Sequence, residues 1–191
     1  MGTDARTMAW LMDEFHRLEG FQPACVTGKP VELFGAPGRE EATGRGVAMI
    51  AATTLEKHGI QVQGARVAIQ GFGNVGRFAA LSCHNLGFKV IAISDITGGI
   101  LDRKGLDIPQ IMKYRSIAEV EKYEKITSQE VLQQKCEVLI PAALGGVINE
   151  SNVSKINCDF VIEGANQPTT FEADKELRGA GVVIVPDILA N

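Results

Sequence analysis

This sequence of 191 residues lacks several features that would point to particular classes of protein. It contains no run of about 18 or more apolar residues, so we expect no membrane-spanning helix. Its first residues do not form a charged segment followed by an apolar one, so we expect no secretory signal. With 23 Asp and Glu against 19 Lys and Arg, the net charge is −4. The sequence therefore lacks the basic excess that attracts nucleic acid.

Cysteine and histidine are scarce and scattered. No Cys-x-x-Cys pair is present, which is typical of reduced thiols in a cytoplasmic protein. The three histidines have no acid or thiol partners at ligand spacing, so we expect no metal site. No Gly-x-Ser-x-Gly motif marks a nucleophile. The residues concerned are Cys25, Cys83, Cys136, Cys158, His16, His58 and His84.

Glycine is the one residue type in clear excess. It provides 21 of the 191 residues, more than the usual share of about 7%. There are only 7 Pro and no repeating glycine pattern, which excludes collagen and low-complexity linkers. The excess predicts many turns or close backbone approaches.

Short runs of Val and Ile alternate with segments of helical periodicity. This alternation predicts an α/β protein with a Rossmann-like, doubly wound, mostly parallel sheet and helices on both faces. No linker divides the sequence, so we expect a single domain over residues 1–191. The expected strands are residues 66–70, 89–94, 137–140, 160–162 and 182–185. The expected helices are residues 8–18, 43–57, 75–86 and 108–120, with short ones opened by capping boxes at 127–130 and 169–172.

The pattern supports three further local expectations. The apolar stripe of the helix over 8–18 is expected to pack on the core. Residues 97–99 are expected to form a glycine-rich turn that leads into a small hairpin ending near Gly105. Residues 20–41 are expected to form a long loop, and loops of this length are often functional.

Gly71-Phe72-Gly73-Asn74-Val75-Gly76 fits the G-x-G-x-x-G pattern directly after one expected strand and at the start of a helix. Gly71 permits the tight turn, Gly73 lets the backbone approach a pyrophosphate, and Gly76 lets the helix pack closely on the strand. The helix N-terminus adds free N–H groups and a partial positive charge. The segment therefore predicts dinucleotide binding.

Asp95 follows the next strand, 19 residues after Gly76. A ribose-binding carboxylate is expected about 20 residues after such a motif. An acid at this place favours NAD over NADP, although Ser94, Arg103 and Lys104 leave NADP as an alternative. The other interpretation of Asp95 is that it only caps a turn.

The residues together resemble the C-terminal, cofactor-binding half of the glutamate/leucine/phenylalanine/valine dehydrogenase family, over essentially the whole length. The most specific segment is Gly38-Arg39-Glu40-Glu41-Ala42-Thr43-Gly44-Arg45-Gly46-Val47, which is similar to the glutamate dehydrogenase branch. Further matching segments are Gly2-Thr3-Asp4-Ala5-Arg6, Thr27-Gly28-Lys29-Pro30-Val31, Ile140-Pro141-Ala142-Ala143-Leu144, Glu163-Gly164-Ala165-Asn166 and Pro186-Asp187-Ile188-Leu189-Ala190-Asn191.

The resemblance implies a role for individual positions. The residues implied to hold the pyrophosphate are Gly71, Gly73, Asn74 and Val75, beside Gly76, with Asp95 on the adenine-side ribose. Those implied at the nicotinamide end are Thr43, Asn166 and Asn191, with Ala142 and Ala143 packing beside it. Arg39 is implied to lie near the substrate. Two of these positions have simpler interpretations: Thr43 as a helix cap and Asn166 as the turn before Pro168.

The resemblance also implies the activity, the reversible oxidative deamination of glutamate to 2-oxoglutarate and ammonia with NAD or NADP. It implies that residues 1–19 form an inter-domain helix. The substrate domain and the catalytic Lys and Asp lie outside this sequence, so we expect this chain alone to be inactive. Full-length members are homo-oligomers, usually hexamers. The alternatives are a non-catalytic nucleotide-binding regulatory module and a leucine- or phenylalanine-type dehydrogenase. Positions that depart from the family pattern are Phe34, Ala36, Pro37, Gly145 and Gly146.

Overall fold

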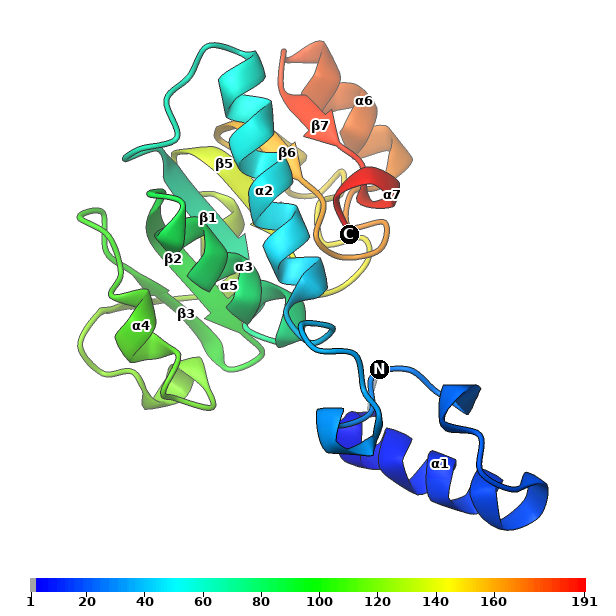
Figure 1. Cartoon of the computed structure of the whole chain (residues 1–191). Helices are drawn as coiled ribbons and strands as arrows, with labels where there is room; N and C mark the ends of the chain where they lie inside the picture. Colours follow the sequence, from blue (N-terminus) through cyan, green and yellow to red (C-terminus); the bar gives the residue numbers. More distant parts are fainter. Residues whose placement is uncertain (1–2) are drawn as a thin grey trace. The chain divides into compact units, whose positions relative to one another are not determined.

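A computed structural model describes residues 3–191 (Figure 1). Its contacts divide the chain into two compact units, Met1–Ala42 and Thr43–Asn191. The single dinucleotide-binding domain expected from the sequence stays a prediction. The boundary falls in the first turn of α2 (Ala42–Lys57). Met1 and Gly2, the latter the first residue of the segment resembling an inter-domain helix, lie outside the described residues.

The first unit is built around α1 (Ala5–Glu19), which agrees with the helix expected there. Asp4 caps it, accepting a hydrogen bond from the Thr7 backbone N–H at 2.8 Å. Two short 3-10 helices follow, η1 (Pro23–Cys25) and η2 (Val31–Leu33). Within this unit the apolar stripe of α1 does not pack on a core, because Met12 is its one buried residue and Leu18 is 67% exposed. No strand of the first unit lies against the stripe, since all described strands belong to the second unit.

The second unit contains a seven-stranded sheet in the order β4-β3-β2-β1-β5-β6-β7. Neighbouring strands from β2 through β1, β5 and β6 to β7 pair in parallel, whereas β3 and β4 pair antiparallel. This confirms the mostly parallel α/β sheet. The strands are β1 (Arg66–Gln70), β2 (Lys89–Asp95), β3 (Gly98–Leu101), β4 (Glu124–Ile126), β5 (Cys136–Pro141), β6 (Cys158–Ile162) and β7 (Val183–Val185).

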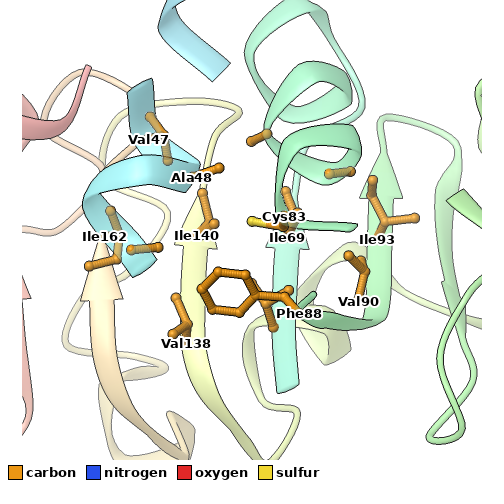
Figure 2. Close-up of a cluster of buried hydrophobic side chains, with 14 of the residues drawn as sticks. Val47, Ala48, Ile69, Cys83, Phe88, Val90, Ile93, Val138, Ile140 and Ile162 are labelled. Atoms are coloured by element: carbon orange, nitrogen blue, oxygen red, sulfur yellow. The ribbon is translucent and has the colours of Figure 1, made fainter. Parts of the chain in front are cut away.

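Helices cover both faces of the sheet, because alternate residues of the central strands point to opposite sides. Ile69, Ile140 and Ile162 face the cluster that contains α2 and α3 residues (Figure 2). Ala68 and Leu139 face a second cluster, formed with α5 and α6. The helices of this unit are α2, α3 (Asn74–Asn85), α4 (Ile108–Ile111), α5 (Ser128–Leu132), α6 (Phe171–Gly179) and α7 (Asp187–Ala190), with 3-10 helices η3 (Ile117–Glu119) and η4 (Val153–Lys155).

The expected helix over residues 108–120 is wrong. The structure has only α4 and η3 there, joined by an irregular segment. The Arg77 guanidinium donates to the carbonyl oxygens of Met112 and Tyr114, at 2.6 Å and 3.0 Å. The Asp95 carboxylate accepts the backbone N–H of Ile117 at 2.7 Å. These side chains bind backbone groups that a continuous helix would have paired internally.

Two smaller expectations need correction. Gly98 and Gly99 do not form the turn; they lie in β3, which pairs antiparallel with β2, and the turn is at residues 96–97. Thr170 rather than Thr169 caps α6, accepting from the Ala173 backbone N–H at 3.3 Å. The other box is confirmed at α5, where Thr127 and Glu130 exchange backbone hydrogen bonds.

Candidate functional site

The carboxyl ends of β1, β5 and β6 lie at the same end of the sheet. The strand order reverses direction between β1 and β5. β1 has β2 on one side and β5 on the other. In open parallel sheets, ligands bind in the crevice at this switch point. The polar and glycine-rich segments that follow these strands are therefore the candidate site.

Two glycines of the turn after β1 are required by the protein itself. Gly71 has φ 114°, in the region that favours glycine, and a Cβ there would lie 2.7 Å from the Ala142 carbonyl oxygen. A Cβ on Gly76 would overlap the Gly71 carbonyl oxygen. Ala142 is fixed in turn by its N–H, which donates to the Gln70 carbonyl at 2.7 Å. The turn and the Ala142–Ala143 backbone therefore pack directly on each other.

Gly73 differs from Gly71 and Gly76, because a Cβ placed on it would meet no heavy atom within 4 Å beyond the adjoining residues of the chain. Gly73 is the N-cap of α3, its φ is −76°, and no side chain caps the helix. The N-cap of this 12-residue helix thus provides no capping side chain, and the position of a Cβ on it is open. An uncapped helix N-terminus beside a bare glycine is suited to bind an anion.

The first turn of α2 lies beside this helix N-terminus. A Cβ on Gly44 would lie 2.6 Å from the Val75 carbonyl oxygen and 2.6 Å from the Ala79 nitrogen, so the two helices touch at Gly44. Thr43, the residue before Gly44, is therefore held next to the start of α3. A Cβ on Gly46 would lie 3.9 Å from the Ala190 carbonyl oxygen, which places α2 close to the end of α7.

Asn166 and Asn191 are brought together from separate segments. The Asn191 side-chain nitrogen donates to the Gly164 carbonyl at 3.0 Å and to the Asn166 Oδ1 at 3.2 Å. This arrangement uses the donor side of Asn191 and the acceptor side of Asn166. The Asn166 Nδ2 and the Asn191 Oδ1 take no part in these two hydrogen bonds, so the pair offers one donor and one acceptor.

Two acidic residues that sequence analysis did not single out hold these segments. Glu163 is 6% exposed, and its Oε2 accepts the Asp187 backbone N–H at 3.1 Å. Asp187 Oδ2 accepts the Gln167 backbone N–H at 2.8 Å. Burial raises the pKa of the Glu163 carboxyl group, and the nearby Asp187 charge contributes to this. The sequence did contain a signal for Glu163, because this acid directly follows the strand expected over residues 160–162 and begins the family-like segment 163–166.

Asp95 accepts four hydrogen bonds from the protein. Its Oδ1 accepts the Thr97 N–H at 2.7 Å and the Thr97 hydroxyl at 2.5 Å, and its Oδ2 accepts the Ser116 hydroxyl at 2.9 Å and the Ile117 N–H at 2.7 Å. Partial burial raises the pKa of this carboxyl group, but these hydrogen bonds together hold it below its usual value. Asp95 therefore caps the turn at residues 96–97, as in the alternative interpretation of the sequence. Its contact with a ribose stays a prediction.

The glutamate/leucine/phenylalanine/valine dehydrogenase family profile matches residues 35–191. The chain belongs to this family. A glutamate dehydrogenase from Thermotoga maritima is 47% identical over 197 aligned residues, covering 100% of this chain and 47% of that protein. The leucine-bound hetero-hexameric glutamate dehydrogenase of Thermus thermophilus is 33% identical with a TM-score of 0.93, covering 100% of this chain and 46% of that one. Glutamate dehydrogenase from Peptoniphilus asaccharolyticus is 35% identical with a TM-score of 0.77, with the same coverage.

This member of the family thus spans about half the length of the relatives it matches. Arg39 lies in the first unit and is exposed, and its proximity to a substrate stays a prediction. Phe34, where the family loop is expected to be glycine-rich, adopts the left-handed conformation with φ 64°. Among residues 3–191, no three His, Cys, Asp or Glu side chains gather as metal ligands. Nor is any helix in that range long and apolar enough to cross a membrane.

Two cavities of this family member lie outside the glycine turn. One, of about 310 Å³, adjoins the Asp95 turn and is lined by Thr97, Gly98, Gly99, Ile117, Ala118, Lys125 and Ile126. The other, of about 490 Å³, is at the amino ends of β1, β5 and β6, and its lining includes Arg103 and Arg66. Arg66 is paired there with Glu137. Arg103 therefore lies at the opposite end of the sheet from Asp95, and Ser94 is fully buried against Ser128.

Proposed function

We propose that this chain is the NAD-binding domain of a glutamate dehydrogenase. The full enzyme would catalyse the reversible oxidative deamination of glutamate to 2-oxoglutarate and ammonia. The family assignment supports this proposal, and so do the named relatives, which are glutamate dehydrogenases rather than leucine- or phenylalanine-type enzymes.

The observation that carries the proposal is the uncapped N-terminus of α3 beside Gly73. A phosphate group would approach the backbone there because the space around the position of a Cβ on residue 73 is open. The backbone N–H groups of the first helical turn, including those of Asn74 and Val75, would bind its oxygens with the help of the helix dipole. Gly71 and Gly76 keep the turn compact enough to present them.

Asn166, Asn191 and Thr43 would orient the nicotinamide end. The Asn166–Asn191 pair presents one amide donor and one amide acceptor, which match the carbonyl and the NH₂ group of a carboxamide. Thr43 adds a hydroxyl beside the start of α3, and Ala142 and Ala143 form an apolar surface at the same edge. The bound cofactor supplies the hydride acceptor; the role of this chain is to fix the face that meets glutamate.

NAD is the preferred cofactor in this proposal, with NADP as the alternative. Asp95 places a negative charge where a 2′-phosphate would lie, which disfavours NADP. Of the three residues considered as phosphate partners, Ser94, Arg103 and Lys104, two offer it little support, because Arg103 lies at the other end of the sheet and Ser94 is buried. The cavity of about 310 Å³ beside Asp95 would accept the adenine ring.

The remaining features of the full enzyme are also part of the proposal. Residues 1–19 would form the helix that links this domain to a substrate domain carrying the catalytic Lys and Asp. The enzyme would work as a cytoplasmic homo-oligomer. Assembly into an oligomer, though not its composition, is supported by the hetero-hexameric form named for the Thermus thermophilus relative. The glutamate or 2-oxoglutarate molecule would bind to the substrate domain and lie near Arg39.

Calorimetric titration of this chain with NAD and then with NADP tests the proposal. We expect weak but measurable NAD binding, weaker NADP binding, and no formation of NADH on addition of glutamate. Failure to bind either dinucleotide would contradict the cofactor role. Glutamate-dependent NADH formation by this chain alone would contradict the placement of the catalytic residues in another domain.

A further inference from the structure

Two segments that leave neighbouring strands are tied together by an exchange of side-chain hydrogen bonds. Residues 163–167 follow β6, and residues 186–191 follow β7. Glu163 in the first segment accepts the backbone N–H of Asp187, and Asp187 in the second accepts the backbone N–H of Gln167. Each carboxylate thus holds the backbone of the other segment. We call these two residues the acidic clamp.

The Glu163 half of the clamp substitutes for a missing helix cap. α7 has only four residues, and its N-cap, Pro186, provides no side-chain acceptor. A helix this short has no stability of its own. The Asp187 N–H is the first of its unpaired donors, and Glu163 satisfies it from outside the helix. Asn191 immediately follows α7, and its N–H donates to the Asp187 carbonyl at 2.8 Å.

The Asp187 half of the clamp stabilises an unfavourable turn. Gln167 has φ 45°, a left-handed conformation that is uncommon for residues other than glycine. Its N–H is the group that Asp187 accepts. Asn166 directly precedes this turn, so the direction of the Asn166 side chain depends on the turn being kept.

The clamp is electrostatically costly, which argues that it does more than hold two loops. Glu163 is buried beside a second acid, Asp187, and Asp174 on α6 adds to the repulsion, while the Thr169 side chain and Arg178 on α6 offset part of it. A buried carboxylate without a directly paired cation is expensive, and an apolar contact would join two loops at lower cost.

We propose that Glu163, acting through Asp187, is a positioning residue that sets the relative orientation of Asn166 and Asn191. This inference rests on the proposed function, in which that pair binds the nicotinamide carboxamide. Without the clamp the pair still exists, but its donor and acceptor no longer face the cofactor together. Binding of the adenosine and pyrophosphate portions is independent of the clamp, because they occupy the α3 end of the site.

The test compares NAD with ADP-ribose, which has the adenosine, the pyrophosphate and the second ribose but no nicotinamide. Glu163→Ala removes the acceptor for the Asp187 N–H. We expect it to lower NAD affinity by about tenfold, the effect of losing one buried hydrogen bond, and to leave ADP-ribose affinity unchanged. Glu163→Gln keeps an acceptor oxygen of the same reach and should retain both affinities. Asp187→Ala should reproduce the selective loss.

Asp174→Asn is the matched control, since it removes a nearby acid that takes no part in the clamp. It should leave the ratio of the two affinities unchanged. Equal losses of NAD and ADP-ribose affinity in Glu163→Ala would overturn the proposal. Circular dichroism melting of each variant establishes that it is folded at the temperature of the titration.

A measurement without ligand separates this proposal from the proposed function. The side-chain amide resonances of Asn166 and Asn191 should shift in Glu163→Ala and return in Glu163→Gln. Unmoved resonances would overturn the clamp whatever the titrations give. A wild-type chain that binds neither NAD nor ADP-ribose would instead contradict the proposed function, and the resonances would then decide on the clamp by themselves.

Discussion

Three glycines in one turn serve different purposes, and the space around each residue distinguishes them. A side chain on Gly76 would overlap the Gly71 carbonyl, and one on Gly71 would meet Ala142, so both positions are constrained by the folded chain itself. Gly73 is exposed and has nothing near the position of a Cβ. The folded chain itself does not require glycine at position 73, so a requirement for glycine there would come from a ligand.

This difference predicts opposite phenotypes for two identical substitutions. Gly76→Ala should lower the free energy of unfolding by about 3 kcal/mol or more, because backbone atoms must move. Gly73 has a φ of −76°, which alanine adopts without strain. Gly73→Ala should therefore leave the melting temperature unchanged or slightly raised. It should nevertheless weaken NAD binding by about tenfold or more, because its methyl group occupies the space of the pyrophosphate. Thermal melting and calorimetry measure the two effects, and an unaffected NAD affinity in Gly73→Ala would contradict the placement of the pyrophosphate.

At the scale of elements, a single side chain fixes the segment after β2. Asp95 joins the end of that strand to η3 through the Ser116 hydroxyl and the Ile117 N–H. The spacing of 19 residues singled out Asp95 for a ribose contact, which stays a prediction, and it contained no information about a partner 22 residues further along. The prediction of a helix over residues 108–120 was wrong for the same reason, because the periodicity of the sequence contains no information about these long-range hydrogen bonds.

The hydrogen bonds of Asp95 to Ser116 and Ile117 should stabilise the fold in a pH-dependent way. The pKa of Asp95 is lowered in the folded state, so the ionised carboxylate stabilises the fold above the unfolded pKa of about 3.9, and this is lost as the pH falls through the folded value. Asp95→Asn should therefore be less stable than wild type at pH 7, and the difference should shrink below about pH 4. Urea unfolding at pH 7 and pH 3 measures it. An equal difference at both pH values would mean that the charge of Asp95 contributes nothing to this stabilisation.

The elements that sequence analysis predicted best are those determined by local pattern. The five parallel strands, α2, α3 and the Thr127 capping box depend on periodicity and short-range hydrogen bonds, and all were predicted. The motif at Gly71–Gly76 predicted the tight turn and the start of α3 that the structure shows, and cofactor binding there stays a prediction. Glu163 and Asp187 were missed as a pair because they are 24 residues apart and meet only through the β6–β7 register. Such pairings become visible only when the fold is known.

At the scale of the whole molecule, burial predicts which thiols react. Desolvation raises the pKa of Cys83 and of Cys158 to about 12 and also raises that of Cys136. Their thiols are protonated at neutral pH and therefore weakly nucleophilic. Cys25, in the first unit, is half-buried. Iodoacetamide should modify Cys25 first, and the other three only as denaturant unfolds the second unit. Mass spectrometry of the labelled peptides checks this, and early labelling of Cys83 would contradict it.

The two units should also differ in stability. The second buries both faces of its sheet, whereas α1 of the first unit buries only Met12 and exposes Trp10 by 62% and Leu11 by 52%. A unit of about 40 residues rarely sustains its own core. We expect the backbone amides of α1 to exchange with deuterium at least about 100-fold faster than those of β1 and α3, through local opening. Mass spectrometry of peptides from both units measures the rates, with β5 as the internal reference. Equal protection of α1 and β1 would show that the first unit unfolds only with the second, and that the exposed stripe of α1 does not weaken it.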